Sequence, residues 1–270
     1  MNISMGQYYP VDSFVHRLDP RTKVLLTILY IVIVFLAKSF VGYALILAYV
    51  LLSAHFSKVP CKMLFRGLKP LRFILILTFL LNLFFNSGET VLLSFWNIRI
   101  TLEGLQMAVF FSLRLIFLVL GTYVLILTTS PVALSDAMEI LLKPLKVIHF
   151  PAHELAMMMT IAIRFIPTLL EETDKIRKAQ MARGADFESG NLISRAKAMI
   201  PLLVPLFVSA FRRAGDLAMA MESRCYHGGE GRTRLRVLKM TRSDAVAFAV
   251  TLFLLVLIIL ERIFLSNLLF

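Results

Sequence analysis

Residues 105–127 read LQMAVFFSLRLIFLVLGTYVLIL, an apolar run with a single charge, Arg114. A helix of this length can cross a bilayer, because the hydrocarbon core needs about 20 apolar residues. The composition agrees: 59% of the 270 residues are hydrophobic and the mean hydropathy is +0.80, whereas soluble domains are roughly 45–50% apolar. The sequence therefore predicts an all-α integral membrane protein, in which Arg114 must face protein, water or headgroups.

Apolar runs elsewhere divide the chain into three regions. Residues 1–128 form an N-terminal membrane region, 129–242 lack an apolar run of spanning length, and 243–270 carry a C-terminal span. The expected spans of the first region are 24–37, 40–56, 71–85 and 105–127. The first two are short, so they are either two spans joined by a tight external turn at Lys38-Ser39 or a tilted, partly re-entrant pair. We expect about five transmembrane helices.

The basic residues indicate how the chain crosses the membrane. The net charge is +12, from 29 Lys and Arg against 17 Asp and Glu. Suppose that the N-terminus and residues 129–242 are cytoplasmic and the C-terminus is external. The only basic residues off the cytoplasmic side are then Lys38, Arg99 and Arg262 outside and Arg114 within a span. Because cytoplasmic loops are enriched in Lys and Arg, this arrangement explains the charge without a nucleic-acid partner.

The residues before the first span predict a helix start. Asp19 can cap free backbone N–H groups, and Pro20 fits the first helical position. The charged N-terminal segment lacks the apolar core of a cleavable signal peptide, so we expect the first span to act as the insertion signal. Cys61 and Cys225 fall on the side assigned to the cytoplasm, where thiols stay reduced, and no structural disulfide is expected.

A long helical pattern follows Pro151 and ends in an arginine between small residues. Its apolar positions recur at helical spacing, and charged residues occupy the other face toward its end. Pro167 should kink it. The pattern ends in Ala182-Arg183-Gly184, where Gly184 can adopt a left-handed cap.

A second pattern of the same kind ends in Ser223-Arg224-Cys225. We expect it to be preceded by a separate short helix over 192–199 and to begin at Pro201 and Pro205, since proline interrupts a helix interior. Its early part is apolar nearly all round, which indicates that it lies at the membrane surface or packs under the spans.

Two explanations of the terminal arginines compete. Basic side chains favour helix C-termini for electrostatic reasons alone. However, the pattern occurs twice, and the small neighbours leave both guanidinium groups unhindered. Such a helix end can lie in a hydrophobic groove of a partner while its arginine pairs with a carboxylate. The methionines between Met138 and Met221 suit an adaptable interface, and ordinary core packing explains them about as well.

At this point the chain resembles a known family, the transmembrane T component of energy-coupling factor (ECF) transporters, which are ABC-type importers of vitamins and transition metals. The resemblance covers nearly the whole chain. It rests on the paired triplets, on Arg164-Phe165-Ile166-Pro167 and on the segment Asp12/His16-Arg17-Leu18-Asp19-Pro20-Arg21-Thr22-Lys23. The length and the N-terminal signature favour a shared T component over one dedicated to cobalt or biotin.

The resemblance implies a non-enzymatic subunit of the bacterial cell membrane. In that family, cytoplasmic coupling helices join two ATP-hydrolysing subunits to a small substrate-binding membrane protein, the S component, and the triplet arginines anchor these helices in grooves of the ATPases. Ala182-Arg183-Gly184 matches the triplet fully. Ser223-Arg224-Cys225 keeps only the arginine, so a glycine-type cap has no support there. The residues expected to face the S component are Met158, Ala162, Phe165, Leu169, Phe207, Ala210 and Phe211.

The sequence contains no motif for chemistry on this chain itself. It has neither a Gly-x-x-x-x-Gly-Lys-Ser/Thr phosphate loop nor a His-Glu-x-x-His pair, and Phe150-Pro151 separates His149 from His153, so no cofactor or metal is expected. No carboxylate lies within an expected span, which disfavours ion-coupled transport. Two alternatives remain: an autonomous membrane-bound enzyme, and a membrane-surface platform built on Arg232, Arg234, Arg236, Lys239 and Arg242.

Overall fold

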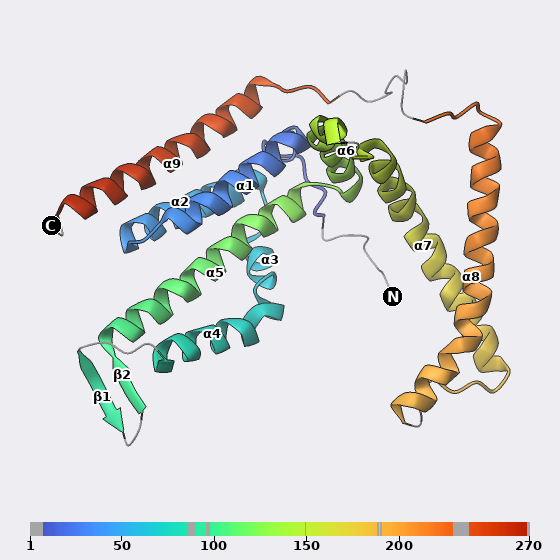
Figure 1. Ribbon diagram of the computed structural model, residues 1–270, viewed down its shortest axis with the longest axis horizontal. Helices are drawn as coiled ribbons and strands as arrows, with labels where there is room; N and C mark the ends of the chain where they lie inside the picture. The colour runs from blue at the N-terminus through green and yellow to red at the C-terminus, as the bar shows by residue number, and fades with distance from the viewer. Residues whose placement is uncertain are drawn as a thin grey trace. The chain divides into compact units, whose positions relative to one another are not determined.

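The computed structural model describes residues 8–85, 90–95, 98–148, 150–187, 189, 191–228 and 238–268. These residues are helical apart from one short hairpin, which confirms the expected all-α class. The chain divides into two compact units. Unit 1 comprises Met1–Ala137 and Val237–Phe270, and unit 2 comprises Met138–Arg236. Figure 1 labels the elements of both units.

Unit 1 is built from long apolar helices and short connecting elements. The long helices are α1 (Pro20–Leu36), α2 (Phe40–Ser57), α4 (Arg72–Phe85), α5 (Leu102–Thr128) and α9 (Arg242–Leu268). The short elements are α3 (Cys61–Arg66), η1 (Lys69–Leu71), β1 (Val91–Phe95) and β2 (Ile98–Thr101). Helix α5 packs against α1, α2 and α4, and α9 packs against α1 and α2. Helix α6 (Pro131–Leu142) begins in unit 1 and ends in unit 2.

Side-chain caps fix the starts of the first two helices. The Asp19 carboxylate accepts a hydrogen bond from the Arg21 N–H at 2.9 Å, with Pro20 at the first helical position, as predicted. The Ser39 hydroxyl oxygen accepts one from the Gly42 N–H at 3.0 Å. The two apolar runs are therefore separate helices with their own caps, joined by a turn at residues 37–39.

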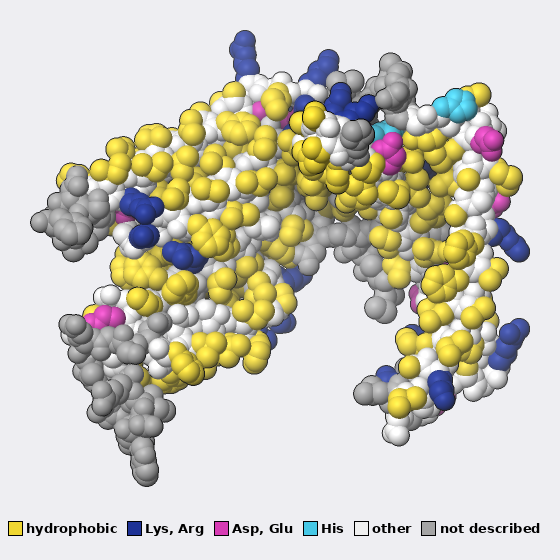
Figure 2. All heavy atoms as spheres, in the orientation of Figure 1, with side chains coloured by type: hydrophobic (Ala, Val, Ile, Leu, Met, Phe, Trp, Pro, Cys, Tyr) yellow, Lys and Arg dark blue, Asp and Glu magenta, His cyan; other side chains and the backbone are white. Residues whose placement is uncertain are grey.

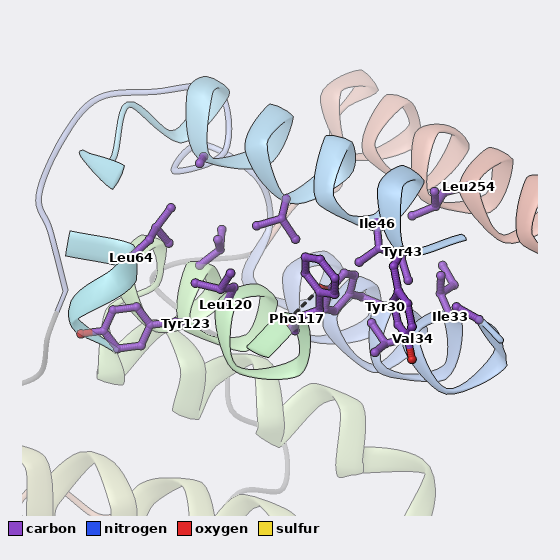
Figure 3. Close-up of a cluster of buried hydrophobic side chains, with 14 of the residues drawn as sticks. Tyr30, Ile33, Val34, Tyr43, Ile46, Leu64, Phe117, Leu120, Tyr123 and Leu254 are labelled. Atoms are coloured by element: carbon purple, nitrogen blue, oxygen red, sulfur yellow. Dashed lines mark hydrogen bonds between the residues drawn. The ribbon is translucent and has the colours of Figure 1, made fainter. Parts of the chain in front are cut away.

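The core of unit 1 lies where α1, α2, α5 and α9 meet (Figure 3). The Tyr30 hydroxyl donates to the Phe117 carbonyl at 2.8 Å, and the rings of Tyr43 and Phe117 stack with centroids 5.8 Å apart. Gly121 makes this approach of α1 to α5 possible, because a Cβ at position 121 would overlap the Tyr30 ring. Other buried members of the core are Ile33, Val34, Ile46, Leu120, Leu127, Leu254 and Ile258.

Arg114, the charge within the α5 run, lies against the turn between α1 and α2. Its guanidinium donates to the Ala37 carbonyl at 3.3 Å. The carbon of the guanidinium lies 5.7 Å from the ring centroid of Phe35 and 5.5 Å from that of Phe111, within cation–π range. The charge therefore faces protein groups, one of the environments that the sequence predicted for it.

In the part of the chain that the structure describes, six helices are long and apolar enough to cross a membrane. They are Phe40–Ser57, Cys61–Phe85, Leu102–Thr128, Ala152–Ala182, Ile193–Glu222 and Arg242–Phe264. This set differs from the five expected spans. Helix α1 has 17 residues and is shorter than all six. Two helices of unit 2 qualify although we expected them in the cytoplasm, and they are less apolar than the other four.

Unit 2 is dominated by α7 (Ala152–Ala182) and α8 (Leu192–Glu222), which pack against each other (Figure 1). The 3₁₀ segment η2 (Lys143–Ile148) precedes α7 and contacts it. Helix α7 continues through Pro167, so the proline lies within one long helix rather than between two.

The prediction of a separate helix over 192–199 is wrong, because α8 is continuous and contains both Pro201 and Pro205. Proline has no N–H, so Pro205 leaves the Pro201 carbonyl without its helical donor. The Gln180 side-chain Nε2 of α7 lies 3.5 Å from that carbonyl oxygen. Both prolines are also exposed, so water can solvate the freed groups. The Gln180 side chain and solvent therefore compensate for the helical hydrogen bonds that the two prolines remove.

A β-hairpin between α4 and α5 is an element that sequence patterns left unassigned. Its strands are antiparallel, with Val91 opposite Thr101 and Phe95 opposite Ile98, and a register shift lies between Val91 and Leu93. The hairpin leads directly into α5, whose first N–H groups the Thr101 hydroxyl caps by accepting from Gly104 at 3.1 Å. It therefore fixes where α5 begins.

Candidate functional site

The first arginine triplet closes α7 with a two-bond C-terminal motif. The Gly184 N–H donates to the Met181 carbonyl at 3.0 Å, and the Ala185 N–H donates to the Gln180 carbonyl at 3.0 Å. These are the two bonds of a Schellman motif, which satisfies the last carbonyl groups of a helix. Gly184 has φ 86°, so the predicted left-handed cap is confirmed.

The second triplet closes α8 in the same way. The Cys225 N–H donates to the Glu222 carbonyl at 2.8 Å, and the Tyr226 N–H donates to the Met221 carbonyl at 3.1 Å. Cys225 has φ 56°. A left-handed cap therefore forms here although the sequence offered no support for one, and cysteine adopts it at a cost of roughly 1–2 kcal/mol for a residue with a Cβ.

Both arginines are presented in the same manner. Arg183 and Arg224 each precede the left-handed residue, and each donates its backbone N–H to the carbonyl three residues earlier, at 3.0 and 3.1 Å. Both side chains are exposed, and within the described residues neither guanidinium has a hydrogen bond or a carboxylate partner. Two unpaired cations thus stand at equivalent helix ends and are available to bind an anionic group.

The seven residues expected to face the S component divide into two groups. Phe165 and Leu169 of α7 and Ala210 of α8 line a groove of about 260 Å³ between the two helices. The exposed members are Met158, Ala162, Phe207 and Phe211. Phe207 and Phe211 are 60% and 76% exposed, and Figure 2 shows hydrophobic side chains along the length of α8. An exposed apolar surface of this extent is typical of an interaction surface.

An ion pair between the two long helices was not predicted. Arg213 of α8 donates to the Glu172 carboxylate of α7 at 2.6 Å, beside the same interhelical groove. The two residues are 41 positions apart, as are Arg183 and Arg224. This shared separation was the only signal in the sequence that could have linked Glu172 to Arg213.

A second unpredicted cluster lies beside the C-terminal motif of α8. The His153 ring Nδ1 is 2.9 Å from a Glu139 carboxylate oxygen of α6, and its Nε2 is 3.3 Å from the Tyr226 hydroxyl. Tyr226 also supplies a backbone bond of the helix-end motif, so the cluster ties that motif to the start of α7. No pattern in the sequence connects these three residues, whose separations are 14 and 73 positions.

The described residues contain no group of three or more His, Cys, Asp or Glu side chains placed to hold a metal ion. His149, one of the two histidines weighed as a metal pair, lies outside these residues, as do Arg232, Arg234 and Arg236 of the basic tract. His153 is engaged by the Glu139 carboxylate and the Tyr226 hydroxyl. The chemistry that the described part of unit 2 offers is therefore recognition by exposed apolar and cationic groups.

Comparisons with known proteins relate the chain to a transport family. A family model described as CbiQ, cobalt transport protein, matches residues 12–235. A protein of Thermosediminibacter oceani is 57% identical over 249 residues, which cover 92% of this chain and 94% of the relative. One of Clostridium kluyveri is 54% identical over 263 residues, 97% of each chain. Both relatives are named energy-coupling factor transporter transmembrane protein EcfT.

The match thus covers the membrane helices of unit 1, the two helix ends of unit 2 and most of the chain between them. Taken with the apolar helices, it makes the chain a multi-pass membrane protein. The chain belongs to the family of transmembrane components of energy-coupling factor transporters.

Proposed function

We propose that this chain is the coupling subunit of an ECF importer that takes up vitamins or other micronutrients. It transmits motion from two ATPase subunits to a membrane-embedded S component, and ATP hydrolysis takes place on the partners. Its N-terminus and unit 2 are cytoplasmic and its C-terminus is external, in keeping with the distribution of basic residues.

The observation that carries this proposal is that the two helix ends have the same backbone geometry. Arg183 and Arg224 are exposed and unpaired within the described residues, and the same pair of backbone bonds holds both. Two equivalent cations suit two equivalent acceptors, as two copies or two related ATPases would provide. A groove with a carboxylate on each ATPase would give a bidentate arginine contact. A subunit that contacts both ATPases through rigid helices can respond to their opening and closing.

The exposed apolar face of α8 supports the contact with the S component. Phe207 and Phe211 are four residues apart and both point away from the protein interior. An apolar membrane protein would bury these rings, because removal of aromatic surface from water or headgroups is favourable. Phe165, Leu169 and Ala210 line the groove between α7 and α8. We therefore assign the contact with the S component chiefly to the exposed residues of the seven that were expected to make it.

The test is co-purification of the tagged full-length chain with its partners from the native membrane. The double variant Arg183→Glu/Arg224→Glu should reach the membrane in normal amount and lose the ATPases. The matched control Arg195→Glu/Arg212→Glu places the same charge change at exposed positions of α8 and should retain them. Normal ATPase recovery and normal uptake by the first variant would refute the proposal.

A second pair of variants separates the two interfaces. Phe207→Asp/Phe211→Asp should reduce recovery of a small hydrophobic membrane protein while the ATPases still co-purify. If the ATPases are lost and the small protein is retained, the assignment of this face is wrong.

A further inference from the structure

The first turn of α1 has a role that its helix cap does not explain. The chain passes between the two units twice, once after Ala137 within α6 and once before Val237. The first passage follows the end of α5 at Thr128, and the second precedes the start of α9. Within unit 1, the end of α5 and the segment before α9 both contact the first turn of α1. Lys23 makes the first contact and Arg21 the second.

Lys23 holds the end of α5, nine residues before the chain first leaves unit 1. Its Nζ donates to the Thr128 carbonyl at 2.9 Å and to the His16 carbonyl at 3.1 Å. Thr128 is the last residue of α5, where carbonyl groups lack helical partners and the helix dipole favours a cation. Lys23 is only 6% exposed. Lysine is rarely buried, because its charge is costly to remove from water, so this position holds it for a specific contact.

Arg21 holds the returning segment. Its guanidinium donates to the Leu238 carbonyl at 2.9 Å and to the Asp19 carboxylate at 2.8 Å. Leu238 lies four residues before the first residue of α9. The Asp19 side chain is 1% exposed and that of Arg21 is 17% exposed, so the ion pair is largely shielded from solvent. One arginine therefore links the cap of α1 to the backbone of the chain returning from unit 2.

A buried carboxylate completes the attachment of the returning segment. One Asp244 oxygen accepts a hydrogen bond from the Asp19 N–H at 2.8 Å, and the other accepts from the Thr241 N–H and hydroxyl at 2.7 and 2.8 Å. Asp244 is 2% exposed. The start of α9 is thus bonded to the residue that caps α1, and α1 is the common support of both passages.

We propose that Arg21 and Lys23 form a two-point mount through which movement of unit 2 is transmitted to the membrane helices. The proposal rests on the coupling function above. Each residue is a positioning residue: it holds a connecting segment against α1, so that displacement of unit 2 moves α1, α5 and α9 instead of being absorbed in the connections. Loss of either contact should uncouple ATP hydrolysis from uptake without separating the subunits.

The test uses the complete complex, purified with its partners and reconstituted in liposomes, with substrate uptake and ATP hydrolysis measured together. Lys23→Met keeps the side-chain length and removes the donor, and Arg21→Gln removes the guanidinium bonds to both Asp19 and Leu238. The control is Arg17→Gln, which breaks an exposed pair with Asp12, where the two side chains are 73% and 71% exposed. It lies just before α1, and within the described residues its side chain bonds only to Asp12 and not to either connection.

We expect both mount variants to retain the ATPases and to show uptake per ATP hydrolysed reduced about tenfold, since a hydrogen bond from a charged group contributes at least about 1.4 kcal/mol. Amide hydrogen exchange around residues 127–131 and 238–244 should be faster by a similar factor. Arg17→Gln should change neither. If exchange is faster and uptake per ATP is unchanged, the contacts are structural only and the proposal is overturned.

A milder variant keeps the test decisive if Arg21→Gln or Lys23→Met fails to assemble. Arg21→Lys keeps the charge, but one ammonium group cannot reproduce the planar fork that reaches both Asp19 and Leu238. It should assemble and lose part of the coupling ratio, and a wild-type ratio would overturn the proposal. The Arg183/Arg224 variant tests the coupling function separately, because it is scored by ATPase recovery and not by uptake per ATP.

Discussion

Replacing Gly184 by alanine should weaken the end of α7, and the structure gives the size of the effect. Gly184 has φ 86°, and apart from the glycine and its two chain neighbours no atom of the described residues lies within 4 Å of a Cβ built on it. Packing therefore contributes nothing, and the cost of a Cβ in the left-handed region remains, roughly 1 kcal/mol. Gly215 offers a matched control. It lies inside α8 with equally open surroundings and no left-handed φ, so alanine should stabilise that helix by about 1 kcal/mol through helix propensity.

The assay is amide hydrogen exchange on the purified chain at fixed pH and temperature, read by mass spectrometry. Gly184→Ala should speed exchange of the amides at positions 184 and 185, which donate the two bonds of the motif, by roughly fivefold. Gly215→Ala should slow exchange in the middle of α8. If both variants slow exchange, or if Gly184→Ala has no effect, position 184 does not require its left-handed conformation and the account of the helix end is refuted.

Further substitutions test other contacts. Cys225→Gly should relieve the strain of the second left-handed cap and slow exchange at positions 225 and 226, in the opposite direction to Gly184→Ala. Gly121→Ala places a Cβ against the Tyr30 ring and should destabilise unit 1 by about 1–3 kcal/mol, measured as a lower melting temperature in detergent. Glu172→Arg and Arg213→Glu should each loosen the contact between α7 and α8, and the double exchange should restore it, as measured by exchange rates along both helices.

The sequence predicted the apolar helices of unit 1 because each apolar run is local information. A cap such as Asp19 or Gly184 likewise specifies a helix end within a few residues, and both caps hold in the structure. The set of helices long and apolar enough to cross a membrane nevertheless differs from the five expected spans. Arg114 could be assigned protein, water or headgroups as neighbours from its position alone, although not the Ala37 carbonyl that it binds.

The error in α8 arises where a contact from another helix overrides local preference. Pro201 and Pro205 favour a helix boundary, but a single helix continues because Gln180 approaches the freed carbonyl and the prolines are exposed. The cap at Cys225 has a different origin, because the two-bond motif that holds its left-handed conformation lies within residues 221–226. Backbone bonds between near neighbours there outweigh the residue's own preference.

The candidate site was predictable in part for the same reason. Arg183 and Arg224 could be selected because their neighbours and their repetition are visible in the chain. The groove that takes up Phe165, Leu169 and Ala210 depends on how α7 and α8 cross, which helical periodicity alone does not give. The bond between Asp244 and Asp19 joins residues 225 positions apart and requires the fold.

The bond between Asp19 and Asp244 spans 225 positions, and unit 1 is made of the two ends of the chain. During synthesis the ribosome completes all of unit 2 before it makes α9. Helices α1 and α2 therefore remain without their α9 partner until then, while the helices of unit 2 are already available to fold. The last helix to be translated packs against the first. A chain truncated before α9 would therefore leave the Asp19 N–H and the α9-facing sides of α1 and α2 without their native partner.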